Sequence, residues 1–212
     1  LLQSGYGVKT YRLLRQYGLF EPLFPLLTPY FTEYEDSMTE KMILRALTST
    51  DERVADKLPI NPAFLFAAFF WYPLRERVEV LKNEGGLNNY DAYALASNDV
   101  LEQLCKSLAV PRRHTAVIRE IWLLQLQFLK RTPKSVQRAI EQAKFRAGFD
   151  LLVMRAEIEG GEAVELAAWW HEYQFSNETQ RQDLVKDLPS QPRKRKYHRR
   201  KRHHSVKKVS HE

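Results

Sequence analysis

The sequence predicts an all-α protein, a body of antiparallel helices followed by a disordered, strongly basic C-terminal tail. Apolar residues repeat at helical spacing along most of the chain, whereas the alternation typical of strands is scarce. Prolines, glycines and capping residues mark where most helices should begin and end. Charge is divided unevenly: residues 193–212 hold ten Lys/Arg and one acidic residue, whereas residues 1–192 hold 23 Lys/Arg against 25 Asp/Glu.

The N-terminal segment predicts one helix and one irregular connector. A helix over about 7–17 should end at Gly18, because glycine suits a left-handed C-terminal cap. The next stretch, residues 19–31, is apolar but carries three prolines, which prevent one continuous helix. We therefore expect a packed irregular segment there.

Capping signals open the next two helices. Ser37 and Glu40 fit a capping box for a helix that continues to about Leu47. Asn61 and Pro62 fit the N-cap and the first position of a second helix.

The longest apolar run, AFLFAAFFWY at 63–72, follows Pro62 directly. Ten helical residues rise about 15 Å, half of a bilayer core, so the run predicts a buried core helix and no transmembrane segment. Pro73 should end or kink this helix, and a short helix over about 74–83 should stop at Gly85 and Gly86.

Three longer helices follow. Asn89 can cap a helix over about 90–108, and Cys105 within it is expected to be buried. Pro111 opens the next helix, and Thr132-Pro133 opens the one after, so that the two should pack as an antiparallel hairpin. The apolar stripes are Tyr93, Ala96, Val100 and Leu104 in the first helix, Val117, Ile121, Leu124 and Phe128 in the second, and Val136, Ile140, Ala143, Ala147 and Leu151 in the third.

Gly160 and Gly161 interrupt the pattern before a last helix over about 162–175. The expected domains are a helical body at 1–175 with a possible sub-boundary near 108–111, a polar linker at 176–192 and the disordered tail at 193–212.

The tail is the first candidate site, because ten cations in 20 residues repel one another unless a polyanion neutralises them. Arginine favours bidentate phosphate contacts, and nothing in the tail reads base sequence, so RNA binding there should be electrostatic and salt-sensitive. Anionic membrane is the alternative polyanion, and nonspecific solubilisation is the alternative role of the tail. The tail candidates are Arg193, Lys194, Arg195, Lys196, Arg199, Arg200, Lys201 and Arg202.

Two basic groups in the body could extend an RNA path. The first group is Arg112, Arg113 and Arg119, and the second is Lys130, Arg131, Lys134 and Arg138. The alternative, that they occupy solvated helix ends without a ligand, stays open. The slightly acidic average charge of the body argues against RNA binding by bulk attraction.

No catalytic residue and no metal site is expected in this chain. Glu33 and Glu35, and likewise Glu157 and Glu159, are paired carboxylates, but no phosphate-binding glycine loop or metal-binding aspartate pair accompanies them. The second pair falls at a predicted helix end, where an acidic rim is ordinary. No Ser/His/Asp or Cys/His signature is present.

Long strings of the sequence resemble the C-terminal half of bacterial poly(A) polymerases of the gammaproteobacterial type, in the class II nucleotidyltransferase superfamily. They include LLQSGYGVKTYRLLRQYGLFEPLFP at 1–25, NPAFLFAAFFWYPL at 61–74 and DAYALASNDVLEQLCKSLAVPRR at 91–113. REIWLLQLQ at 119–127, KFRAGFDLLVMRAEIE at 144–159, AAWWHEYQ at 167–174 and the basic tail continue the resemblance over almost the whole chain.

The resemblance implies a polynucleotide adenylyltransferase of the bacterial cytoplasm that adds poly(A) from ATP to single-stranded RNA 3′ ends. ATP and Mg²⁺ would be used by an N-terminal nucleotidyltransferase head of the same polypeptide, and the body and tail would hold RNA. The head's Gly-Ser motif and carboxylates are absent from these residues, so the chain by itself should bind RNA without catalysing. Two alternatives stay open: the helical body of a CCA-adding tRNA nucleotidyltransferase, and a stand-alone nucleic-acid-binding protein.

Overall fold

The fold is seen in a computed structural model, which describes residues 1–186; within them all regular structure is helical. The helices are α1 (Gly7–Gln16), α2 (Phe20–Leu23), the 3-10 helix η1 (Pro25–Tyr30), α3 (Met38–Ala55), α4 (Pro62–Phe69), α5 (Trp71–Gly85), α6 (Asn89–Ser107), α7 (Arg112–Phe128), α8 (Pro133–Ile140), α9 (Phe145–Glu159), α10 (Gly161–Phe175) and α11 (Glu178–Lys186). The all-α prediction is confirmed, and the tail expected at 193–212 lies beyond the described part.

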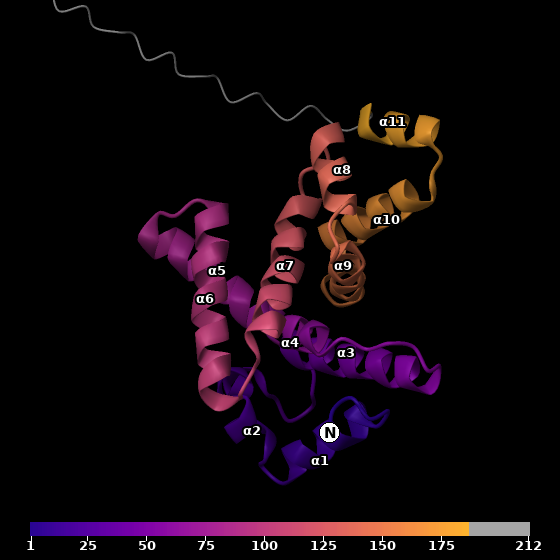
Figure 1. Ribbon diagram of the computed structural model, residues 1–212. Coiled ribbons are helices and arrows are strands. Elements are labelled where there is room, and N and C mark those ends of the chain that lie inside the picture. The colour runs from indigo at the N-terminus through magenta and orange to yellow at the C-terminus, as the bar shows by residue number, and fades with distance from the viewer. Residues whose placement is uncertain (187–212) are drawn as a thin grey trace, which may run out of the picture.

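The helices form an elongated body with α7 at its centre (Figure 1). α1, α2 and η1 lie at one end beside α3 and α4, and α5 and α6 pair along one side. α8 to α11 lie at the other end. α7 therefore runs from the middle of the molecule to the end that carries α8.

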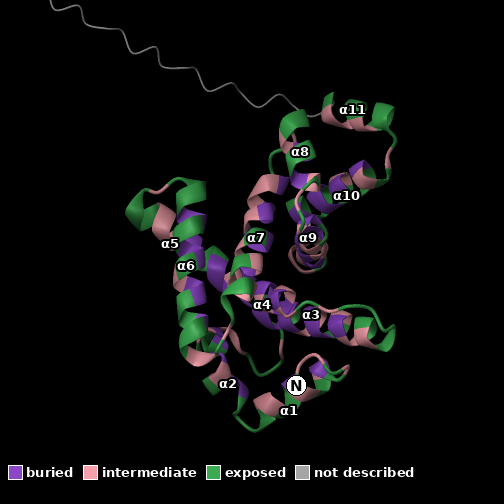
Figure 2. Ribbon diagram, in the orientation of Figure 1, coloured by how far each residue is buried: buried purple, intermediate pink, exposed green. Residues whose placement is uncertain are grey.

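Two apolar cores share the helices α7 and α9. The first core takes Ile121 and Trp122 from α7, and the second takes Leu124 and Phe128 from the same helix. Gly148 of α9 allows the close approach, since a Cβ at this position would lie 2.7 Å from Leu124 Cδ1. Figure 2 shows buried residues on the facing sides of these helices, whereas α8 and α11 are largely exposed. The sub-boundary near 108–111 stays a prediction.

Local signals placed several helix ends correctly. The capping box of Ser37 and Glu40 is present, and the Asn61 side chain accepts a hydrogen bond from the N–H of Ala63. Gly18 adopts a left-handed conformation with φ 62°. Other ends differ from expectation. α3 continues to Ala55, and its additional turns are held by the buried Thr50 and by Asp51, which accepts from the N–H groups of Gly7 and Val8. The cap of α6 is Asn88 rather than Asn89.

The helix predicted to start at Thr132-Pro133 is two helices. α8 ends at Ile140, a turn follows, and α9 begins at Phe145. Ala143, expected on the buried stripe, is exposed in that turn. The break lets Phe145 and Phe149 enter the second core beside Phe128, which a continuous helix with the predicted stripe would not have done.

The apolar run at 63–72 is divided at Phe70, so that Pro73 occupies the first turn of α5 and does not end a helix. Within the described residues no helix is both long and apolar enough to span a membrane. Cys105 is exposed, contrary to expectation. It follows the buried Leu104 by one residue, which is about 100° around the helix, and therefore faces solvent.

The predicted linker at 176–192 is partly helical, since residues 178–186 form α11. Leu184 and Val185 pack against the second core, and the Arg181 guanidinium donates to the carbonyls of Tyr173 and Gln174 at the end of α10. These contacts explain why a polar segment is helical here. Residues 187–192 are outside the described part.

Glu40 is a buried charge that joins three segments. It is fully buried at the third position of α3, and its carboxylate accepts hydrogen bonds from the N–H of Thr32 and of Ser37. The Arg15 guanidinium of α1 donates to it at 2.9 Å. Burial alone raises the pKa of Glu40, but the hydrogen bonds from Arg15, Thr32 and Ser37 outweigh burial and the pKa is lowered.

This lowered pKa predicts a loss of stability in acid. Because the folded pKa of Glu40 lies below its ordinary value of 4.5, the stabilisation is complete above that value and is lost as the pH falls through the folded pKa. We expect Glu40→Gln to lower the melting temperature at neutral pH. Between about pH 5 and about pH 3 the melting temperature of this variant should fall less steeply than that of the unmodified chain. Circular dichroism melts would measure both, with the exposed Glu33→Gln as control. If the melting temperatures of the unmodified chain, Glu40→Gln and Glu33→Gln fall in parallel as the pH is lowered, the prediction is wrong.

Candidate nucleic-acid interface

Basic residues occupy both ends of α7. Arg112 and Arg113 form its first turn and are exposed, whereas Lys130 and Arg131 follow its last turn. The helix has 17 residues and so spans about 25 Å. The two groups expected from the sequence are thus held at opposite ends of one rigid element.

The second group forms a compact surface, which we call the α7–α8 corner: Lys130, Arg131, Lys134 and Arg138. A capping box of Thr132 and Ser135 fixes the start of α8. Val136 and Ala139 on the inner face of α8 are buried, which turns the side chains of Lys134 and Arg138 to solvent. The four cations therefore lie on two consecutive segments, the connection after α7 and the helix α8. α8 lies at the end of the molecule away from α1 (Figure 1).

None of the seven body candidates pairs with a carboxylate within residues 1–186. Elsewhere in that part ion pairs are common, and ten of its 23 Lys/Arg form one. Arg119 differs from the other six, because its guanidinium donates to the Asn98 side chain at 2.9 Å. Arg112, Arg113 and the α7–α8 corner are consequently the cations best placed to meet a ligand.

The helix dipole adds to the uncompensated positive charge at the start of α7. The N-terminus of a helix carries a partial positive charge from its unpaired N–H groups. Arg112 and Arg113 lie at that end, and the first turn of α7 contains no acidic residue. Two cations held against a positive helix end repel it, so an anion bound there would relieve the repulsion.

The body is polarised, although its average charge is close to neutral. Residues 112–146 hold nine Lys/Arg and two acidic residues, whereas the remaining described residues hold 14 Lys/Arg against 22 Asp/Glu. The expectation that the body would not bind RNA by bulk attraction rested on the average charge, which does not describe this local separation. Local potential at α7 and α8 is what a phosphate chain would meet.

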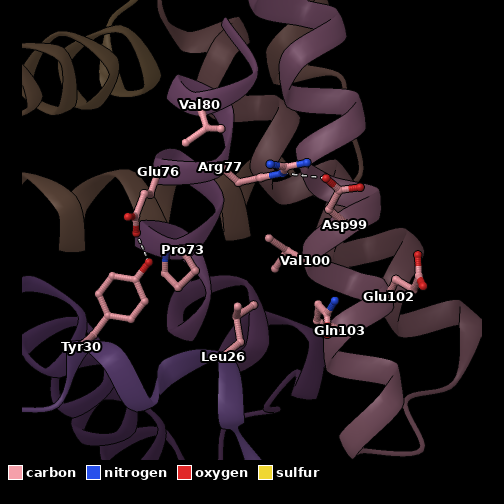
Figure 3. Close-up of a pocket in the computed structure, with 10 residues that line it drawn as sticks. All are labelled: Leu26, Tyr30, Pro73, Glu76, Arg77, Val80, Asp99, Val100, Glu102 and Gln103. Carbon is pink, nitrogen blue, oxygen red and sulfur yellow. Dashed lines mark hydrogen bonds and ion pairs between the residues drawn. The ribbon is translucent and has the colours of Figure 1, made fainter. Parts of the chain in front are cut away.

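A cavity of about 590 Å³ has the wrong charge for RNA. It lies between η1, α5 and α6, where Leu26, Pro73 and Val100 line its apolar part (Figure 3). Three carboxylates surround it, those of Glu76, Asp99 and Glu102, against one arginine, Arg77, which pairs with Asp99 at 2.7 Å. Phosphates would be repelled there.

Glu159 is not part of an acidic rim, contrary to expectation. It ends α9 beside a second cavity of about 410 Å³ and forms an ion pair with Arg155 at 3.0 Å. The Trp71 indole donates to it at 3.1 Å, and the Arg155 guanidinium lies 4.5 Å from the centre of that indole. Burial alone raises the pKa of Glu159, but hydrogen bonds from Arg155 and Trp71 and the charges of Arg155 and Arg75 outweigh it, and the pKa is lowered.

Glu157 points to the surface and pairs with Arg45 of α3 at 2.5 Å. The two carboxylates of the Glu157/Glu159 pair are therefore both engaged in ion pairs, with different partners. Both carboxylates therefore hold α9 against neighbouring side chains.

The tail candidates from Arg193 to Arg202 are outside the described residues, but the chain leading to them starts near the α7–α8 corner. Lys186, the last described residue, ends α11, and α11 packs on the core to which α8 contributes Val136. Arg193 follows Lys186 by seven residues, which span at most about 25 Å. The first tail cations are thus tethered to the basic end of the molecule.

Sequence reasoning missed one side chain beside the corner, Trp169 of α10. The Arg131 guanidinium lies 5.5 Å from the centre of its ring. The Trp169-Trp170 pair was visible as an apolar helix segment, but only the fold shows that Trp170 enters the core and Trp169 faces the connection between α7 and α8.

Two protein-family models match the chain. Residues 85–204 match one described as the polymerase A arginine-rich C-terminus. Residues 1–31 match one described as the probable RNA and SrmB-binding site of polymerase A. The first match contains α7, α8 and the residues of the tail up to His204.

Curated relatives resemble the chain over most of its length. A poly(A) polymerase I from Haemophilus influenzae is 71% identical over 205 residues, which are 95% of this chain and 45% of the relative. Poly(A) polymerase I from Escherichia coli O157:H7 is 47% identical and that from Salmonella typhi 48% identical, each over 95% of this chain and 44% of the relative. The chain thus spans less than half the length of these relatives.

Proposed function

The chain belongs to the polymerase A family, and from this membership we propose that it is the RNA-binding part of a poly(A) polymerase. Its role would be to hold an RNA 3′ end while a nucleotidyltransferase head of the same polypeptide adds adenylate from ATP. The matches favour this role over the CCA-adding and stand-alone alternatives, since the curated relatives named above are poly(A) polymerases.

One observation carries the proposal. The exposed cations of α7 and α8 have no carboxylate partners within the described residues, and they lie at the end of the body to which the basic tail is tethered. Lys and Arg that contact phosphates release counterions from the nucleic acid and so bind any sequence. The expected mode is retention of single-stranded RNA without base readout, in the bacterial cytoplasm.

The chemistry of adenylate transfer is assigned to the head. We place ATP and Mg²⁺ in that head because the resemblance to bacterial poly(A) polymerases assigns nucleotide chemistry to it. For residues 1–31 the matched description also supports a protein partner.

Deleting residues 193–212 tests the role of the tail. The truncated chain should bind single-stranded RNA more weakly, and the slope of log affinity against log salt should become shallower by about 0.7 for each lost phosphate contact. Fluorescence anisotropy of labelled oligoadenylate at several salt concentrations would measure both quantities. Equal affinity and equal slope in the two proteins would rule out the tail as an RNA-binding element.

A further inference from the structure

Aromatic rings and arginines form a row along α10 beside the α7–α8 corner. Trp169 and Tyr173 stack with ring centres 5.3 Å apart and planes inclined by 20°. The Arg131 guanidinium lies 5.5 Å from the Trp169 ring centre, and that of Arg181 lies 5.3 Å from the Tyr173 ring centre. Arg181 is engaged with backbone carbonyls, so Arg131 is the end of the row that is open to a ligand.

Charge separates the Arg131–Trp169 contact from those of Arg15 and Arg155. Arg15 packs on Phe31 but is neutralised by Glu40, and Arg155 packs on Trp71 but is neutralised by Glu159. Within residues 1–186 Arg131 has no hydrogen bond or ion pair of its side chain. Its charge is therefore available to a phosphate.

Trp169 is also the accessible tryptophan of the chain. The other three, Trp71, Trp122 and Trp170, are buried with at most 1% of their surface exposed. Trp169 is partly exposed; its ring packs on Tyr173 and faces the α7–α8 connection at Arg131. A flat ring thus lies at the surface next to uncompensated cations.

On the basis of the proposed function, we propose that Trp169, with Arg131, is a stacking site for an unpaired RNA base. Lys130, Lys134 and Arg138 would contact the flanking phosphates. Every base offers a π-face, so stacking tolerates sequence, but a base inside a duplex has both faces covered. The corner should therefore prefer single-stranded RNA to duplex RNA of equal length.

Tryptophan fluorescence gives a direct test on the full chain, because three of the four tryptophans are buried. Oligoadenylate should quench the emission, and a duplex RNA of the same length should quench it much less. Trp169→Phe keeps a ring but should lose the quenching. Quenching that is equal for oligoadenylate and duplex, or that persists in Trp169→Phe, would overturn the stacking site.

Affinity gives the second test. Trp169→Leu retains an apolar side chain but no ring, and it should bind labelled oligoadenylate about tenfold more weakly while duplex binding changes little. Phe175→Leu, on the same helix but outside the row, serves as the control and should bind like the unmodified chain. Circular dichroism checks folding; if Trp169→Leu is unfolded, the quenching experiment with the unmodified chain still decides.

The two proposals fail differently. Normal oligoadenylate binding by folded Trp169→Leu, together with a loss of binding on charge reversal at Lys134 and Arg138, would refute stacking and leave the basic corner in place. Binding that survives the charge reversal would instead refute the corner as an RNA-binding surface.

Discussion

Replacing Lys134 and Arg138 together by Glu is expected to weaken binding of single-stranded RNA by about 10- to 100-fold at low salt. Both side chains are exposed on α8 and have no carboxylate partner within the described residues, so the change removes two favourable charges and adds two repulsive ones. The slope of log affinity against log salt should become shallower by about 1.4. Anisotropy titrations of labelled oligoadenylate at several salt concentrations measure both effects.

The matched control reverses two cations elsewhere. Lys41 of α3 and Lys106 of α6 are also exposed, and the double substitution by Glu changes the net charge by the same amount. Lys106 pairs only with the surface residue Glu102, so little stability is lost. An equal loss of affinity in the two double variants would mean that net charge, and not the α7–α8 corner, governs binding.

Glu159→Ala is expected to lower the free energy of unfolding by about 3 kcal/mol, because it leaves the partly buried Arg155 without its carboxylate. The Trp71 indole also loses its acceptor. Glu157→Ala, two residues earlier on the same helix, removes a surface pair with Arg45 and should cost less than about 1 kcal/mol. Denaturant unfolding followed by circular dichroism compares the two variants.

A double substitution tests the origin of that loss. In Glu159→Ala with Arg155→Met the uncompensated charge is absent, so the double variant should be more stable than Glu159→Ala alone. If the loss of stability in the double variant equals the sum of the losses in Glu159→Ala and in Arg155→Met, the network stabilises the fold through packing and not by neutralising the charge of Arg155.

Local signals carried most of the fold prediction. Ser37, Asn61 and Gly86 act through neighbouring backbone groups, and such short-range interactions are readable from a few residues. The break between α8 and α9 was not readable, because the stripe from Val136 to Leu151 fits one helix. The aromatic contacts of Phe145 in the second core decided between the two arrangements.

The candidate interface was predictable in part. Residue type and position identified the cations of α7 and α8 as candidates, but their freedom from ion pairs depends on tertiary contacts. Arg45 illustrates this dependence, since its partner Glu157 lies 112 residues away in the chain. For the same reason the side of α10 that Trp169 occupies became known only with the fold.

The sharing of α7 and α9 between two cores has a thermodynamic consequence. Neither core can open without disturbing helices that the other needs, so the body should lose its structure as one cooperative unit rather than in halves. A ligand held by the exposed end of α7 then stabilises that whole unit. Binding lowers the free energy of the native state relative to opened forms that have lost the binding surface. Occupancy by RNA at one end would thereby protect the distant segments around α3 and α4 from proteolysis and local opening.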